Sequence, residues 1–278
     1  MKSKVLPILF LLLFIMPVWG QEEINKTFTV SVDRPFEIIL NVDAGEVVVV
    51  RGESGSSVHV ILRYPEDEYR DRISFNEQKN RLRVFVDKRS WTRWRKDNEN
   101  SFLKVELPFE ADILLDARVK AGEISMELGG LRMKELSFSN WAGEVELSFD
   151  QPNLIEMDFF DFSSRVGEVR LINLGNARFH KADINGGIGE MEVDFTGDLL
   201  DQSMAKVDLD IGEASIQLPE GMGIKMRIGG GFSFLSHKEI DSSLYRRGSY
   251  YYSEDFNDME KKFYVRITPG LGELTINR

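Results

Sequence analysis

The sequence contains no cysteine, few histidines and prolines, and no long apolar run beyond its first twenty residues. Without cysteine there is no disulfide, no Cys-ligated zinc, no iron–sulfur cluster and no thiol nucleophile. The 35 Lys and Arg are outnumbered by 46 Asp and Glu, for a formal net charge of −11. This acidic balance argues against general nucleic-acid binding, because phosphate neutralisation needs a basic surface. What the chain does contain is 42% hydrophobic residues, which is enough for a folded core.

The first twenty residues have the pattern of a secretory signal. Two lysines precede the apolar run Val5–Trp19, and Gly20 separates this run from polar residues. A basic start, a short apolar stretch and a small residue at the cleavage point are typical of export. The alternative is an uncleaved anchor, but fifteen apolar residues fall short of the ~20 that cross a bilayer. We expect residues 1–20 to be a signal peptide and residues 21–278 to act in the periplasm or at the cell surface, without a membrane span.

A Gly-Glu pair recurs along the chain, usually after Ala, Val, Ile or Leu. The pairs begin at Gly45, Gly122, Gly143, Gly167, Gly189, Gly212 and Gly272. The five central copies lie 21, 24, 22 and 23 residues apart. After each pair apolar and polar residues alternate, and this period of two predicts a strand with one buried face. A second alternating run precedes the pairs, with the apolar members Leu136/Phe138, Ile155/Met157/Phe159, Ala177/Phe179 and Val207/Leu209/Ile211.

Two short strands and two turns in about 22 residues would form one coil of a parallel β-solenoid. Residues 121–218 would be the regular coils, with a glycine at each corner where the backbone needs a positive φ or a close approach. The flanks 21–120 and 219–278 read as irregular caps, because a solenoid must cover its terminal edges. An antiparallel sandwich is the structural alternative, and it explains short strands but not a fixed coil length. We predict an all-β fold with residues 21–278 as a single domain.

The repeated Ala-Gly-Glu-Val strand starts resemble the toast-rack family of bacterial proteins regarded as candidate adhesins. The closing stretch, from Leu218-Pro219-Glu220-Gly221 to Gly270-Leu271-Gly272-Glu273, is similar to the C-terminal domain of LiaF-type cell-envelope stress proteins. The resemblance implies a right-handed parallel β-solenoid-like fold and a non-catalytic role in the envelope or at the surface. It supplies no catalytic residues. The chain departs from LiaF-type proteins by having a cleavable signal in place of membrane helices, which argues against a direct signalling role.

Two segments rich in arginine and aromatic residues, 88–96 and 245–252, stand out against the acidic background. Their candidate binding residues are Arg89, Trp91, Arg93, Trp94 and Arg95 in the first segment and Tyr245, Arg246, Arg247 and Tyr250 in the second. Tryptophan faces stack on sugars or cations, arginine binds carboxylate or phosphate, and tyrosine and arginine are enriched at binding hot spots. The structural interpretation of the first segment is a hairpin loop whose tryptophans fold back onto the solenoid. That of the second segment is a capping loop with partly buried tyrosines.

The glutamates of the Gly-Glu pairs would form a column if all the pairs occupy equivalent corners. A divalent cation would relieve the repulsion between such carboxylates. The plainer interpretation is a set of solvated side chains, because no calcium-binding nonapeptide pattern occurs and the next outward column is mixed. That column is Ser125, Glu146, Arg170, Glu192 and Ser215. We therefore assign no metal and no cofactor.

The sequence gives little support for catalysis. The three histidines are scattered, with His59 expected on a solvated strand face, and no zinc motif, nucleophile elbow or phosphate loop occurs. We predict an exported, non-enzymatic, adhesin-like binding protein of the bacterial envelope or surface. Its expected partners are an envelope polysaccharide or an envelope or surface protein, not nucleic acid, and its oligomeric state is left open. The alternatives are a polysaccharide-cleaving β-solenoid enzyme and a scaffold in envelope-stress signalling.

Overall fold

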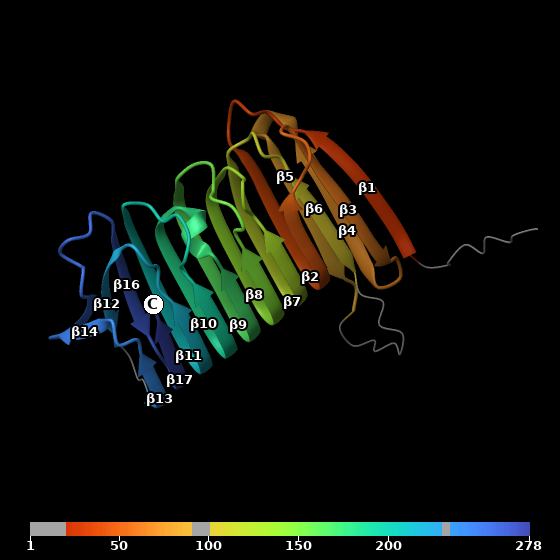
Figure 1. Cartoon of the computed structure of the whole chain (residues 1–278). Helices are drawn as coiled ribbons and strands as arrows, with labels where there is room; N and C mark the ends of the chain where they lie inside the picture. The colour runs from red at the N-terminus through yellow and green to blue at the C-terminus, as the bar shows by residue number, and fades with distance from the viewer. Residues whose placement is uncertain (1–20, 91–100, 230–233) are drawn as a thin grey trace, which may run out of the picture.

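The computed structural model describes residues 21–90, 101–229 and 234–278, and in this part the chain is almost entirely β-structure. Figure 1 shows the strands stacked side by side in one long row. The strands are β1 (Gln21–Thr29), β2 (Phe36–Arg51), β3 (Ser57–Pro65), β4 (Tyr69–Asn76), β5 (Arg81–Lys88), β6 (Phe102–Leu107), β7 (Ile113–Glu127), β8 (Met133–Ser148), β9 (Met157–Ile172), β10 (Phe179–Asp194), β11 (Gln202–Gln217), β12 (Gly223–Ile228), β13 (Phe234–Ile240), β14 (Leu244–Arg247), β15 (Tyr250–Ser253), β16 (Lys262–Thr268) and β17 (Leu271–Asn277). Two short 3-10 helices, η1 (Glu77–Lys79) and η2 (Leu174–Ala177), complete them. The predicted signal, residues 1–20, lies outside the described residues.

Each central coil is one long strand that bends at its glycine and is followed by one loop. The expectation of two short strands separated by a turn is wrong, because the bend does not interrupt the parallel pairing. In β8 the bend falls at Gly143, which has a φ of +131°. A Cβ atom at Gly143 would lie 1.9 Å from the carbonyl oxygen of Gly122 on β7. Positive φ and close approach, the two reasons predicted for glycine at a corner, therefore both apply here.

The bends divide the strands into two sheets that share β2 and β7–β11. The halves before the glycines form the first sheet, in the order β4-β5-β2-β7-β8-β9-β10-β11-β16-β12-β15-β14. The halves after the glycines form the second sheet, in the order β1-β3-β6-β2-β7-β8-β9-β10-β11-β17-β13. Pairing among the shared strands is parallel, as a solenoid requires, so the all-β solenoid-like prediction is confirmed.

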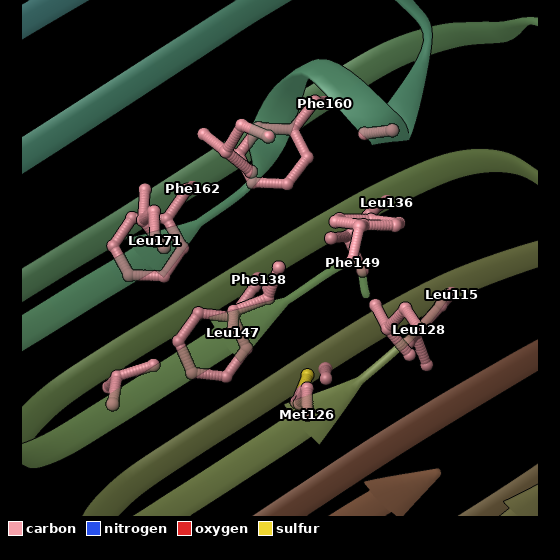
Figure 2. Close-up of a cluster of buried hydrophobic side chains, with 14 of the residues drawn as sticks. Leu115, Met126, Leu128, Leu136, Phe138, Leu147, Phe149, Phe160, Phe162 and Leu171 are labelled. Carbon is pink, nitrogen blue, oxygen red and sulfur yellow. The ribbon is translucent and has the colours of Figure 1, made fainter. Parts of the chain in front are cut away.

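The core lies between the two sheets and is filled by one continuous cluster of apolar side chains. Figure 2 shows Phe138 and Leu147 of β8 in one layer of the core and Phe162 of β9 in the next layer. The rings of Phe138 and Phe162 stack with centroids 5.2 Å apart. The inward residues were mostly predicted correctly. Phe160 is buried in place of Phe159, and Ile155 is only half-buried. Leu209 is also half-buried, and Ile211 is 47% exposed because it lies at the bend.

Asparagine side chains fasten the loops that close the coils. Asn153 is 1% exposed, and its Oδ1 accepts a 2.8 Å hydrogen bond from the backbone N–H of Met133. Its Nδ2 donates to the carbonyl oxygens of Met133, Ile155 and Ala177, in the preceding, the same and the following coil. One side chain therefore satisfies buried backbone groups in three layers, which holds the loops in the spacing of the strands.

The regular stack is longer than the predicted range 121–218. Gly45 of β2 pairs in register with Gly122, and Gly272 of β17 pairs in register with Gly212, so all seven Gly-Glu pairs belong to it. The long sequence intervals on either side contain the capping strands that were expected. At the N-terminal end β3, β6, β4 and β5 extend the sheets, and at the other end β12, β15 and β14 do so. The described residues include no helix that could span a membrane.

Candidate functional site

The C-terminal end of the first sheet carries a hairpin made of β14 and β15. Its turn is Gly248-Ser249, and Gly248 has a φ of +64°, which glycine adopts without strain. Tyr245 pairs with Tyr252, and Arg247 pairs with Tyr250. Because alternate residues of a strand share a face, these four side chains lie on the same side of the hairpin.

The tyrosines of the hairpin belong to a chain of touching rings. Tyr245 stacks on Tyr252 with ring centroids 6.0 Å apart, and Tyr250 lies 6.3 Å from Tyr252. The chain continues through Phe256, 5.2 Å from Tyr252, to Tyr264 of β16. Aromatic pairs at these separations attract one another, and together they present ring faces and hydroxyls on one surface.

Four cations lie among these rings. β12 pairs with β15 and places Lys225 beside Tyr252, and the Lys225 Nζ is 4.7 Å from the ring centroid of Tyr250. The guanidinium carbon of Arg227 is 5.9 Å from the same centroid, and Arg266 of β16 pairs with Arg227. With Arg247 these make four positive charges, and within the described ranges none of the four takes part in an ion pair. We call this surface the cap face: Lys225, Arg227, Tyr245, Arg247, Tyr250, Tyr252, Tyr264 and Arg266.

The structure brings three of the predicted site residues together, namely Tyr245, Arg247 and Tyr250. Arg246 lies on the opposite side of the hairpin, opposite Tyr251, and its Nε donates to the carbonyl oxygen of Gly248. It therefore supports the turn and does not contribute to the cap face.

Arg89 lies at the other end of the first sheet, just after β5 (Figure 1). Its Nε donates hydrogen bonds of 3.1 Å and 2.8 Å to the carbonyl oxygens of Glu66 and Tyr69. Arg89 thus closes the turn between β3 and β4. The remaining predicted residues of this segment, Trp91, Arg93, Trp94 and Arg95, lie outside the described residues. Arg89 and the hairpin of β14 and β15 therefore lie at opposite ends of the first sheet.

Sequence reasoning missed Lys225, Arg227, Tyr264 and Arg266. The pattern of β12, Ile-Lys-Met-Arg-Ile, and that of β16, Phe-Tyr-Val-Arg-Ile, each alternate buried apolar with outward polar residues. This alternation could have predicted that Lys225 and Arg227 of β12, and Arg266 of β16, point outward. It could not show that both strands lie beside the hairpin, because they are parallel neighbours that are distant in sequence.

The predicted glutamate column is present. The glutamates at 46, 123, 144, 168, 190, 213 and 273 pair in register on adjacent strands, and all are exposed. The mixed outward column of Ser125, Glu146, Arg170, Glu192 and Ser215 lies beside it, also in register. Among the described residues no group of three His, Asp or Glu side chains converges enough to hold a metal ion. Strand spacing of ~4.8 Å keeps the carboxylates apart, which favours solvation over chelation.

His59 lies on the outer face of β3, as expected, and is half-buried. Its Nδ1 is 3.0 Å from Glu106 Oε2, and its Nε2 is 2.6 Å from Asn25 Oδ1. The hydrogen bond from Lys104, followed by that from His59, lowers the pKa of Glu106. These contacts tie β1, β3 and β6 together.

Comparison with known proteins gives a family match and several similar structures. Residues 20–159 match the family model described as the N-terminal domain of toast_rack. A candidate cell adhesion protein from Clostridium sporogenes is 12% identical, with 92% of this chain and 99% of that chain covered and a TM-score of 0.45. A candidate adhesin from Bacteroides fragilis is 10% identical, with 92% and 97% covered and a TM-score of 0.40. The comparison with curated proteins finds no match.

Proposed function

The chain belongs to the toast-rack family, and from that premise we propose that it is an exported, non-enzymatic binding protein of the bacterial envelope or surface that holds anionic polysaccharide on its cap face. The observation that carries the proposal is the cap face itself. It places four cations without ion-pair partners among the described residues beside four tyrosine rings, on a chain whose net charge is −11.

An anionic polysaccharide suits both components of this surface. Its carboxylates or sulfates would pair with the guanidinium groups of Arg227, Arg247 and Arg266, which can donate two parallel hydrogen bonds each. The faces of its sugar rings would pack on Tyr245 and Tyr250, which are already held by neighbouring rings. Because the surface is exposed, the ionic part of the binding should weaken as salt rises.

The proposal includes export of the protein from the cytoplasm. The basic and apolar pattern of residues 1–20 predicts a signal peptide, and the chain after it folds without needing disulfides. We propose the periplasm or the cell surface as its location, with residues 21–278 as one domain.

The test measures binding of residues 21–278 to polygalacturonate, with neutral dextran as the comparison ligand, at 0.05 M and 0.3 M salt. We expect binding to polygalacturonate only, with weaker binding at the higher salt. The triple variant Arg227→Ala, Arg247→Ala, Arg266→Ala should bind at least tenfold more weakly, and Tyr250→Ala should weaken binding at both salt concentrations.

The matched control removes three exposed arginines that already have carboxylate partners: Arg63→Ala, Arg72→Ala and Arg118→Ala. It lowers the net charge by the same amount but leaves the cap face intact, so its affinity should stay within twofold of the parent. Equal losses in the two triple variants would mean that only overall charge matters, and would overturn the proposal. Release of reducing ends during the incubation would overturn its non-enzymatic part.

A further inference from the structure

A row of exposed aliphatic side chains runs along the bend of the molecule. Val166, Ile188, Ile211 and Leu271 stand directly before their glycines, in register on β9, β10, β11 and β17. Their exposed fractions are 47%, 52%, 47% and 48%. We call this row the elbow ridge. Exposed aliphatic residues are ordinary when scattered, but a contiguous row of them marks an interaction surface.

A small hollow of about 30 Å³ lies within the ridge. Its walls include Ile188, Ile211 and Leu271, and Met191 and Leu209 also line it. Gly186 and Gly187 line it too. The ridge is therefore indented, and an apolar side chain of a partner can gain contact on more than one side there.

A row of carboxylates runs parallel to the ridge. Glu168, Glu190, Glu213 and Glu273 follow the same glycines, so each lies two residues, roughly 7 Å of strand, beyond its aliphatic neighbour. All four are exposed, and none forms an ion pair within the described part of the chain. The surface thus pairs an apolar stripe with a stripe of uncompensated negative charge.

The spacing of these stripes matches an α-helix that lies across the strands. Adjacent strands are ~4.8 Å apart, and a helix presents one residue per turn of ~5.4 Å on a given face. Over the three gaps between β9, β10, β11 and β17 the two repeats differ by less than about 2 Å. A helix with an apolar stripe and a flanking row of Lys or Arg would place its apolar side chains on the ridge and its cations over the carboxylates.

We propose that the elbow ridge is the docking surface for a cationic amphipathic helix of a partner protein. This surface is separate from the cap face, so the proposal does not depend on polysaccharide binding. A strand cannot be the occupant, because β9, β10 and β11 are already paired along both edges (Figure 1). An anionic membrane is disfavoured, because the carboxylate row would repel its headgroups. A second copy is also disfavoured, because its own ridge would bring a second row of carboxylates against the first and the two rows would repel each other.

The test uses a designed 18-residue peptide of Leu, Ala and Lys as the probe. Its leucines recur every three or four residues, and its lysines flank them on one side. Binding of the fluorescein-labelled peptide to residues 21–278 is followed by anisotropy at 0.15 M salt. We expect saturable micromolar binding that a scrambled peptide of the same composition does not show.

Two variant pairs separate the apolar and charged contributions. Ile188→Ser with Ile211→Ser should weaken binding at least tenfold at any salt, and Glu190→Lys with Glu213→Lys should do so most strongly at low salt. All four positions are exposed, so the fold should survive, as circular dichroism would verify. The cap-face triple variant should bind the peptide as the parent does.

The matched controls change equally exposed residues away from the ridge. They are Leu154→Ser with Met204→Ser for the apolar pair and Glu53→Lys with Glu220→Lys for the charged pair. Both should stay within twofold of the parent. Equal losses in the controls, binding of the scrambled peptide, or no binding would overturn the proposal. So would self-association of the parent that Ile188→Ser with Ile211→Ser abolishes, because that result would assign the ridge to a second copy.

Discussion

Replacing Gly143 by alanine tests whether the close approach of the coils requires glycine. A Cβ atom there would lie 1.9 Å from the carbonyl oxygen of Gly122, and both atoms belong to paired backbone in the middle of the stack. Gly229 supplies a matched control, because its φ of +134° is nearly the same as the +131° of Gly143. Among the described residues, nothing lies within 4 Å of a Cβ atom at Gly229.

The expected losses of unfolding free energy follow from the φ that the two positions share and from the contact that only Gly143 makes. A non-glycine residue at such a φ costs about 1–3 kcal/mol, and both variants bear this cost. At Gly143 the Cβ atom and the Gly122 carbonyl oxygen must also separate by about 1.5 Å to reach an ordinary contact distance. Weakening two ladder hydrogen bonds adds about 1–3 kcal/mol. Gly143→Ala should therefore lower the free energy of unfolding by about 2–6 kcal/mol, and Gly229→Ala by about 1–3 kcal/mol.

The assay is thermal unfolding of residues 21–278 followed by circular dichroism at 218 nm. For a chain of this size 1 kcal/mol corresponds to about 2–4 °C in Tm, so the contact cost of about 1–3 kcal/mol should separate the two variants by roughly 2–12 °C. Equal Tm losses in the two variants would show that φ strain alone determines the cost, and that the contact between stacked glycines contributes nothing.

Two further substitutions test the polar parts of the coils. Burial, followed by the negative charge of Asp183 on the neighbouring strand, raises the pKa of Asp161, so the folded state holds its proton more tightly than the unfolded state does. The stabilising contribution of the protonated Asp161 is fully present below about pH 4 and is lost as the pH rises through the folded pKa. At pH 7, Asp161→Asn removes the repulsion of a like-charge cross-strand pair and should raise the free energy of unfolding by a few tenths to about 1 kcal/mol, and Tm with it. At pH 3 it should not raise Tm. Asn153→Ala leaves the buried N–H and C=O of Met133 without their side-chain partner, and should lower the urea midpoint by the equivalent of about 3 kcal/mol with an unchanged m-value. A gain from Asp161→Asn that persists at pH 3, or an unchanged midpoint for Asn153→Ala, would contradict these assignments.

The sequence predicted the stacking better than the shape of each coil. The Gly-Glu pairs fix the register from β7 to β11, because alternation decides which residues face inward and the glycines decide which residues are neighbours. The same pattern could not show that each strand continues through its glycine. A positive φ at Gly143 is compatible both with a turn between two strands and with a bend inside one strand. Only the parallel pairing, which continues on both sides of Gly143, shows that it is a bend.

The candidate sites were harder to predict for a related reason. Tyr245, Arg247 and Tyr250 could be found because they are close in sequence. Arg227 and Arg266 join them only through the pairing of β12 with β15 and β16, which no local pattern encodes. The elbow ridge was visible as the aliphatic residue before each glycine. Its exposure was not, since Ile211 continues a buried alternation up to the point where the backbone turns.

The uniform register of the coils makes the length of the molecule an adjustable quantity. Each central strand presents the same edges to its two neighbours. Removing the 24 residues 143–166 would therefore join the first half of β8 to the second half of β9 and leave one continuous strand between β7 and β10. Such a deletion would bring the two ends of the stack about 4.8 Å closer, and a duplication would move them apart by the same step. Neither change alters the terminal strands. The number of coils alone therefore sets how far the hairpin end lies from the β1 end, in steps of about 4.8 Å.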